Sequence, residues 1–165
     1  MRAVVQRVDR AAVAVGGKEI SSIQQGLVAF VGIEKGDTTK DADYLVDKII
    51  NLRIFEDPEG KMNLSLLDKN GEFMVISQFT LLGDCRKGRR PSFYQAEEPL
   101  NAKKLYDYLI VKSREKIHKV GTGEFQAMMK IDLLNDGPVT MLLDSRTSSQ
   151  ISEESLEGPG KHTPV

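Results

Sequence analysis

The sequence has few of the side chains that enzymes most often use for chemistry. Its 165 residues include one cysteine, two histidines and no tryptophan. A lone cysteine excludes an intramolecular disulfide and favours a reducing compartment. Neither Cys85 nor His118, the reactive side chains of the part that we expect to fold, has the sequence partners of a catalytic dyad or triad. Conventional nucleophilic catalysis is therefore not predicted.

Long apolar runs and an excess of one charge are also missing. No run approaches the roughly 18 residues of a membrane helix, and charges interrupt residues 1–15, so we expect neither a membrane anchor nor a signal peptide. The formal net charge is −1, so nucleic acid would have to bind at a local basic patch. Motifs for metals and nucleotides are absent, so no metal and no cofactor are predicted. The composition is typical of a cytoplasmic protein.

Strand-like stretches outnumber helical ones. Gly16-Gly17 between two β-prone runs predicts a two-residue hairpin. The run at 27–33 is apolar apart from Gly32, as in a strand that is covered on both faces. The predicted strands are 2–8, 11–15, 18–23, 27–33 and 73–82, with a closing strand pair at 128–134 and 139–143.

Two stretches have helical spacing. Asp37 is the expected N-cap of the first, and the second runs from 101 to 118 with Tyr108 on or beside its inner stripe. Together the elements predict an α+β fold, in which two main helices pack outside a curved, barrel-like, mainly antiparallel or mixed β-sheet. We expect one domain at 1–145 and a disordered C-terminal tail at 146–165.

Polar residues interrupt the predicted 73–82 strand. Ser77, Gln78, Phe79 and Thr80 place two hydroxyls, an amide and an aromatic ring in an otherwise apolar run. Such side chains can simply satisfy one another and the backbone. Alternatively, Phe79 and neighbouring backbone N–H groups shape a nucleobase pocket, and the polar side chains line a scissile ester. Both interpretations are open at this point.

A second unusual feature is the hexapeptide at 135–140, Asn-Asp-Gly-Pro-Val-Thr. Its residues favour turns, so a surface turn is the simplest interpretation. However, an X-Pro bond adopts cis at low cost, and a preceding glycine removes the steric restriction of a Cβ. A cis Gly137-Pro138 step would turn two carbonyl oxygens the same way. Such a rigid pair of acceptors suits the capture of an α-amino group.

One basic loop stands out in the balanced chain. It follows the 73–82 strand, and the aromatic pair Phe93-Tyr94 comes after it. A solvated loop is the plain interpretation. The loop also suits the phosphates of a nucleic-acid end, with the aromatic pair as a stacking surface. Its cations are Arg86, Lys87, Arg89 and Arg90.

Taken together, these stretches resemble the D-aminoacyl-tRNA deacylase family, the chiral proofreading enzymes of translation. The similarity covers about residues 1–145. SQFT at 77–80 and NDGPVT at 135–140 are its two signature motifs. The other matches are MRAVVQRV at 1–8, EGKMNLS at 59–65, VISQFTL at 75–81, RRPSF at 89–93 and LYDY at 105–108.

The resemblance implies a homodimer with active sites at the subunit interface. It implies hydrolysis of the ester between a D-amino acid or glycine and the tRNA 3′-terminal adenosine, so the partners would be D-aminoacyl-tRNA and glycyl-tRNA. The Gly-Pro step of one subunit would enter the partner's pocket. There Gly137 and Pro138 would receive the amino group and exclude L side chains, without metal or cofactor.

The resemblance also assigns roles to single residues. In the Gln6-Arg7 pair, the arginine would hold the Gly137-Pro138 carbonyls. Phe79 would stack near the terminal adenine, with its N–H and that of Thr80 near the developing oxyanion. Ser77-Gln78 would help to hold the 3′ end. Because Thr80 has no base to activate it, attack by a water that substrate groups activate is favoured over attack by its hydroxyl.

Two other functions are open. A non-catalytic nucleic-acid-binding homodimer would need the basic loop at 86–90 but not the Gly-Pro step. A protein that binds a small amine or a D-amino acid would not need the basic loop. A deacylase needs both features, and the near-neutral charge argues against a general nucleic-acid binder.

Overall fold

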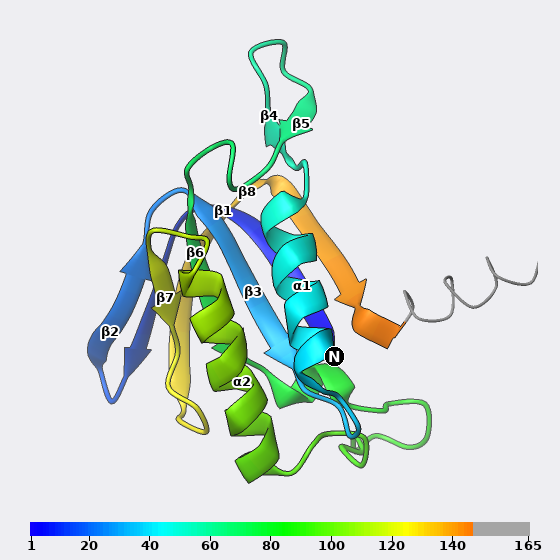
Figure 1. Cartoon of the computed structure of the whole chain (residues 1–165). Coiled ribbons are helices and arrows are strands. Elements are labelled where there is room, and N and C mark those ends of the chain that lie inside the picture. The colour runs from blue at the N-terminus through cyan, green and yellow to red at the C-terminus, as the bar shows by residue number, and fades with distance from the viewer. Residues whose placement is uncertain (147–165) are drawn as a thin grey trace, which may run out of the picture.

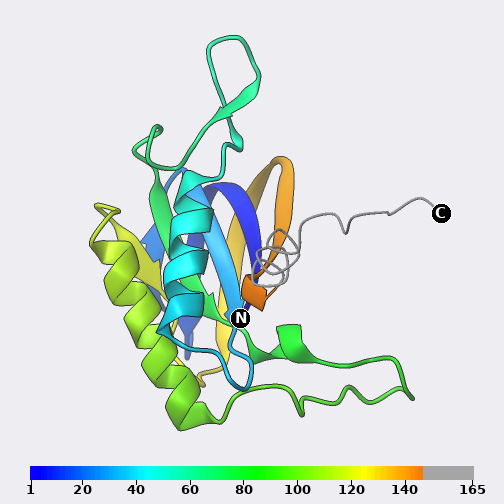
Figure 2. The same cartoon turned by 45° about the vertical axis from the view of Figure 1, so that its right-hand side comes forward.

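The computed structural model describes residues 1–146 as a strongly curved mixed sheet with two helices on one face (Figures 1 and 2). The remainder of the expected tail, 147–165, lies outside the described residues. No helix of the described part is long and apolar enough to cross a membrane.

The sheet contains β1 (Arg2–Val15), β2 (Lys18–Ile23), β3 (Gly26–Gly32), β6 (Glu72–Ser77), β7 (Val120–Thr122) and β8 (Met129–Asp144). The helices are α1 (Thr39–Asn51) and α2 (Pro99–Arg114), and a small hairpin, β4 (Phe55–Glu56) with β5 (Met62–Leu64), projects from the body (Figure 2).

The long strand β1 organises the sheet. The strand order is β2-β1-β3-β6-β7, and β8 also pairs with β1. β1 is antiparallel to β2, β3 and β8, whereas β3–β6 and β6–β7 are parallel. Register shifts interrupt the β1–β8 ladder on both sides of Val8, and such bulges increase local bend and twist. The expected α+β fold with a curved, barrel-like mixed sheet is confirmed.

Two apolar layers cover the two faces of the central strands. The first lies between the sheet and the helices, and the second lies inside the curve of the sheet. β3 contributes Leu27 and Ala29 to the first layer and Val28 to the second, as expected for a strand that is covered on both faces. The second layer consists of Val8, Ala11, Val13, Ile23, Val28, Met74 and Ile76.

The cap of α1 differs from the prediction by one residue. Thr38 is the N-cap and forms a capping box with Asp41. Asp37 is buried instead, where it accepts hydrogen bonds from the Met1 amino nitrogen at 2.8 Å and from the Glu34 N–H at 2.6 Å. The prediction of Asp37 as the cap was wrong because its carboxylate forms a buried ion pair with the Met1 amino group.

The inner stripe of α2 also differs from the prediction. Tyr106, not Tyr108, is buried, and its hydroxyl donates to the Val75 carbonyl oxygen at 2.8 Å. Burial of the Tyr106 phenol raises its pKa to about 12. Tyr108 lies at the edge of the helix and donates to the carboxylate of Asp43 on α1. The helix begins at Pro99, in the first turn where proline is tolerated.

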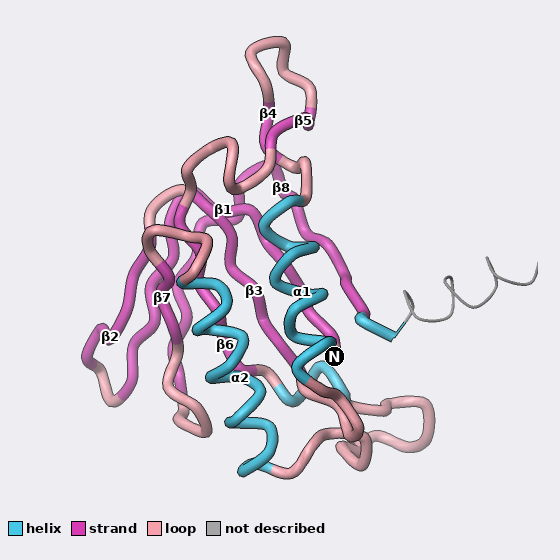
Figure 3. Tube along the Cα trace, in the orientation of Figure 1, coloured by secondary structure: helices cyan, strands magenta, loops and turns pink. Residues whose placement is uncertain are grey.

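The predicted 73–82 strand is shorter than expected. β6 ends at Ser77, and Phe79–Leu82 forms a short 3-10 helix, η1 (Figure 3). The Gln78 N–H still donates to the Val31 carbonyl oxygen at 2.8 Å, but the next backbone bonds are local, including Gly83 N–H to Thr80 O at 3.0 Å. The polar residues therefore stand at the end of a strand and not in its middle.

The predicted closing strand pair is in fact one strand. Both halves of β8 pair with β1, so they do not pair with each other. Asn135 pairs with Val8 and Thr140 pairs with Gln6, so several residues of β8 stand opposite Arg7 alone. Residues 135–139, here called the Gly-Pro loop, therefore bulge from the strand.

Candidate active site

One pocket gathers the complete 77–80 motif. It has a volume of about 740 Å³ and lies between η1, the start of α2 and the segment that leads into β8. Most of its lining is apolar, with a few polar groups, which is typical of small-molecule sites. Its lining residues are Val31, Ile33, Ser77, Gln78, Phe79, Thr80, Ala96, Glu97, Pro99, Ala102, Phe125, Gln126, Ala127, Met128, Met129 and Ile131.

The four motif residues meet because β6 ends there and the chain turns at once. Ser77 is the last residue of β6, and the turn at Gln78 directs Phe79 outward, where 58% of its surface is exposed. The Gln78 side-chain amide donates to the Thr80 hydroxyl oxygen, which fixes the orientation of that hydroxyl. The N–H groups of Phe79 and Thr80 open η1 and have no intrahelical acceptor. The residues that line the pocket therefore include two backbone donors without an intrahelical acceptor, an oriented hydroxyl and an aromatic ring.

One wall of this pocket was not expected from the sequence. Residues 125–129 line it, although no candidate site residue was assigned to this segment. Phe125 packs on the Tyr106 ring with centroids 5.8 Å apart, which anchors the wall to α2. A Cβ on Gly123 would lie 2.5 Å from the Met129 sulfur, so a larger residue at 123 would have to displace the Met129 side chain.

The Gly-Pro loop lies elsewhere on the chain. The Gly137-Pro138 bond is cis, as predicted. Both residues are exposed, and neither lines the pocket. Along β8, the six steps from Ile131 to Gly137 correspond to about 20 Å of strand. A single chain therefore does not bring the two motifs together.

Side-chain hydrogen bonds hold the neck of the Gly-Pro loop. The Asn135 amide nitrogen donates to the Arg7 and Val139 carbonyl oxygens, each at 3.0 Å. Arg7 lies on β1 and Val139 is the last residue of the loop, so the Asn135 side chain links the first residue of the loop both to β1 and to the last residue of the loop. The point where these three residues meet is here called the neck of the loop.

Arg7 of β1 contacts the same loop through its side chain. Its side chain is 5% exposed, donates to the Ile54 carbonyl oxygen at 2.6 Å and forms an ion pair with Asp136 at 2.9 Å. Nη2 of Arg7 lies 3.1 Å from the position that a Cβ on Gly137 would take. The guanidinium is thus beside the Gly-Pro step, but within the described residues it donates a hydrogen bond to Ile54 and forms an ion pair with Asp136, and the expected contact with the Gly-Pro carbonyls stays a prediction. Gln6 donates to the Thr140 hydroxyl at 3.1 Å.

The basic loop belongs to a segment, 83–98, that extends away from the body of the protein (Figures 1 and 2). Arg86 is not a free cation, because its guanidinium contacts both carboxylate oxygens of Asp84 at 2.9 and 2.7 Å. The hydrogen bonds from the Arg86 side chain lower the pKa of Asp84 to about 2. Within residues 1–146, no acidic side chain pairs with the remaining cations. These are Lys87, Arg89 and Arg90, all exposed and outside the pocket lining.

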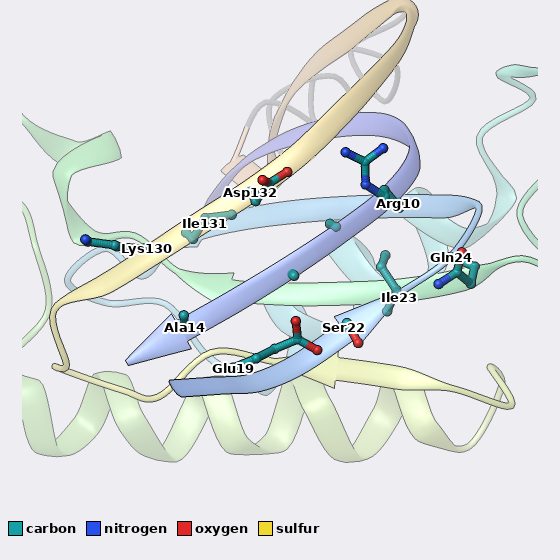
Figure 4. Close-up of a pocket in the computed structure, with 11 residues that line it drawn as sticks. Arg10, Ala14, Glu19, Ser22, Ile23, Gln24, Lys130, Ile131 and Asp132 are labelled. Atoms are coloured by element: carbon teal, nitrogen blue, oxygen red, sulfur yellow. The ribbon is translucent and has the colours of Figure 1, made fainter. Parts of the chain in front are cut away.

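A second hollow of about 520 Å³ lies between β1, β2 and β8 (Figure 4). Ala14 forms part of its floor, with Glu19 of β2 on one side and Lys130 of β8 on the other. It contains no residue of either signature motif. The described residues also contain no group of three or more acidic, histidine or cysteine side chains that could hold a metal ion. The pocket at 77–80 is therefore the candidate active site.

Comparisons with known proteins agree with the sequence resemblance. The family model of D-Tyr-tRNA(Tyr) deacylase matches residues 4–144. The D-aminoacyl-tRNA deacylase of Syntrophus aciditrophicus is 62% identical over 146 residues, covering 88% of this chain and 98% of the relative. That of Thermosipho melanesiensis is 59% identical over 147 residues, with coverages of 88% and 98%.

Two solved structures share the fold of this chain. One named as the c-Myc DNA unwinding element binding protein has a TM-score of 0.83 and 41% identity, covering 87% of this chain and 98% of its own. A probable eukaryotic D-amino acid tRNA deacylase shares the fold, with a TM-score of 0.74, 18% identity and coverages of 87% and 98%. The family match covers most of the chain, so the protein belongs to the D-Tyr-tRNA(Tyr) deacylase family.

Proposed function

We propose that the protein is a D-aminoacyl-tRNA deacylase, a cytoplasmic hydrolase that cleaves the ester between a D-amino acid or glycine and the 3′-terminal adenosine of tRNA. The observation that carries this proposal is the convergence of Ser77, Gln78, Phe79 and Thr80 on one pocket. Family membership supplies the substrate class, because the relatives carry this activity in their names.

The pocket suits ester hydrolysis without a side-chain nucleophile. The adenine lies against Phe79 in the apolar part, and the ester carbonyl oxygen points to the N–H groups of Phe79 and Thr80. A water oxygen bonds to the carbonyl carbon, the ester C–O bond breaks, and the ribose oxygen leaves with a proton. The Thr80 hydroxyl, which Gln78 orients, positions the reacting groups. Ser77 and Gln78 hold the 3′ end.

The Gly-Pro loop acts as the chirality filter in this proposal. Gly137 and Pro138 are exposed and present backbone carbonyls with almost no side chain, while Asn135 and Arg7 hold the loop in place. The substrate amino group binds these carbonyls. An L side chain would then point into the loop, whereas a D side chain points away and glycine has none.

The active site is completed by a second copy of the chain. The loop lies about 20 Å from the pocket along β8, so the loop that serves this pocket comes from a partner. An apolar row of Phe30, Val4 and Leu142 crosses the sheet on the face away from the helices, and Leu142 is 81% exposed. An exposed apolar row of this kind supports a homodimer with two shared sites.

The direct test of the activity is release of D-tyrosine and L-tyrosine from charged tRNA. We expect rapid release of the D-amino acid, slow release of the L-amino acid and measurable release of glycine from glycyl-tRNA. Equal rates for both enantiomers, or no release of D-tyrosine, would contradict the proposal.

Subunit complementation tests the shared site. A pocket variant, Phe79→Ala, is mixed and refolded with a loop variant, Gly137→Ala. In the latter, the added Cβ would lie 2.8 Å from a Val139 methyl group at a φ of 121°. Each heterodimer has one intact pocket facing one intact loop, so equal mixing should restore about a quarter of wild-type activity. If pocket and loop serve the same chain, the mixture stays inactive.

The alternative function is a nucleic-acid-binding homodimer without catalysis. The 41% identical structure bears the name of a DNA-binding protein, and the basic loop is exposed and mostly unpaired. In that case the protein would bind tRNA equally well whether charged with D-tyrosine or uncharged, and would release no amino acid.

A further inference from the structure

We propose that Tyr94, Phe93 and Lys35 form a second nucleotide subsite beside the pocket. Its ligand is the base of the unpaired nucleotide that precedes the terminal adenosine of the tRNA. This inference rests on the proposed function, because it extends the binding site of the same substrate by one nucleotide.

Of two further aromatic residues, Phe93 stands next to the aromatic residue of the pocket and Tyr94 comes directly after Phe93 in the sequence. Phe79 lines the pocket, and the Phe93 ring meets it edge to face with centroids 5.0 Å apart. Tyr94 follows in the sequence and is 75% exposed. A single exposed aromatic residue is ordinary. In the proposed subsite, a strand of nucleic acid that leaves the pocket passes Phe93 and reaches the Tyr94 ring, and every base has a π-face that can stack on such a ring.

The Tyr94 ring is oriented before any ligand arrives. The Lys35 ammonium lies 3.9 Å from the ring centroid, so a cation covers one face of the Tyr94 ring. Most of the Tyr94 side chain remains exposed to solvent. Lys35 itself is exposed and stands after β3, next to the chain that carries Tyr94. The ammonium is thus available to a phosphate as well as to the ring.

Backbone hydrogen bonds fix the segment that carries the aromatic pair. Asp84 and Ser92 exchange two backbone bonds of 2.8 and 3.0 Å. Farther along, the Lys35 N–H donates to the Gln95 carbonyl oxygen at 2.9 Å, and the Glu97 N–H donates to the Ile33 carbonyl oxygen at 2.9 Å. The platform is therefore anchored at both ends, which lowers the entropy cost of binding.

The surrounding charge favours RNA over an apolar partner. Lys87, Arg89 and Arg90 lie a few residues before Phe93 in the same segment. Aromatic rings next to free cations are the combination by which proteins bind single-stranded nucleic acid, with stacking for the bases and cations for the phosphates. A protein ligand would meet a strongly charged border instead of the polar rim around an apolar centre that is usual for interfaces.

The experiment compares two substrates in each variant. One is D-tyrosyl-tRNA, and the other is adenosine esterified with D-tyrosine at its 3′ oxygen, which has no preceding nucleotide. In Tyr94→Leu we expect KM for the tRNA to rise about tenfold, because stacking of one base on an aromatic ring is lost. Its kcat on the tRNA should stay unchanged, and so should both constants for the nucleoside ester. Tyr94→Phe keeps the ring and should behave like the wild type.

Tyr108→Leu is the matched control. Tyr108 also has a lysine near its ring, with the Lys112 ammonium 5.7 Å from the centroid, but it lies on α2 outside the pocket lining. It should leave both substrates unaffected. If the wild type cleaves neither substrate, the proposed function fails. If the wild type cleaves both and Tyr94→Leu impairs both equally, or impairs neither, the function stands and the subsite is refuted.

Discussion

Asn135 is the residue whose replacement tests most sharply how the Gly-Pro loop is held. Its side-chain nitrogen donates to the carbonyl oxygens of Arg7 and Val139, at 3.0 Å in each case. In Asn135→Ala, two partly buried carbonyls lose these donors. In Asn135→Asp, the shape is kept but an oxygen replaces the nitrogen that faced them.

The expected magnitude follows from these two bonds. A protein hydrogen bond contributes a net 0.5–1.5 kcal/mol or so, and the loss of two should cost Asn135→Ala about 2 kcal/mol. For a chain of this size, that corresponds to a decrease in Tm of about 4–8 °C. Asn135→Asp should cost more, because a carboxylate would face two carbonyl oxygens and stand beside the carboxylate of Asp136.

The assay is thermal unfolding at neutral pH for the wild type and both variants, followed by D-tyrosyl-tRNA hydrolysis well below each Tm. Asn51 of α1 is the control, since its side-chain nitrogen also donates to a carbonyl oxygen, that of Asp47, but on the exposed helix surface. Asn51→Ala should change Tm by much less. A milder effect of Asn135→Asp than of Asn135→Ala would refute the reasoning, because shape and not hydrogen bonding would then hold the neck. Normal hydrolysis by a folded Asn135→Ala would show that the loop geometry does not matter for catalysis.

Three further predictions address charge, chemistry and stability. Asp84→Asn should release Arg86 from its ion pair, which strengthens tRNA binding and steepens the slope of log affinity against log salt by about 0.7, measured by titration at several salt concentrations. Thr80→Ala should slow single-turnover hydrolysis without abolishing it, because the hydroxyl positions the reacting groups and does not attack the ester. A complete loss of hydrolysis would indicate instead that the hydroxyl is the nucleophile. Burial raises the Tyr106 pKa to about 12, so ionisation favours the unfolded chain, and the wild type should lose stability as the pH rises from about 10 towards 12. In Tyr106→Phe this alkaline loss should be smaller in Tm measurements, and at neutral pH the variant should be less stable because the bond to Val75 is gone.

Local chemistry allowed much of the fold to be predicted. The hairpin at Gly16-Gly17 is present, with φ values of 59° and 82° that suit glycine, and the apolar 27–33 run is a doubly covered strand. The end of β6 could not be predicted in the same way. Residues 79–82 are as β-prone as those before them, but the neighbouring strand β3 ends at Gly32 and offers no further backbone partner. Tertiary pairing, not propensity, ends the strand.

The candidate site was predicted in its motifs and not in its surroundings. The residues from Ser77 to Thr80 were assigned to a pocket and do line one. The wall at 125–129 was missed because nothing in its composition marks it until the chain folds back beside β6. The ion pair between Arg7 and Asp136 was missed for a related reason, since the sequence shows a buried cation but not which carboxylate reaches it. Contacts between distant segments are the information that motif analysis lacks.

The arrangement of β8 suits the role that we propose for the Gly-Pro loop. One strand carries a pocket wall at Met129 and Ile131 and, farther along, the Gly-Pro loop, and β1 pairs with it on both sides of the loop. The distance between pocket and loop is therefore set by strand geometry rather than by a mobile connection. In a two-fold pair, the contact that brings one loop to the partner's pocket brings the second loop to the first pocket as well. In the proposed mechanism, discrimination then depends on how rigidly two backbones meet, which would explain why the chain has so few catalytic side chains.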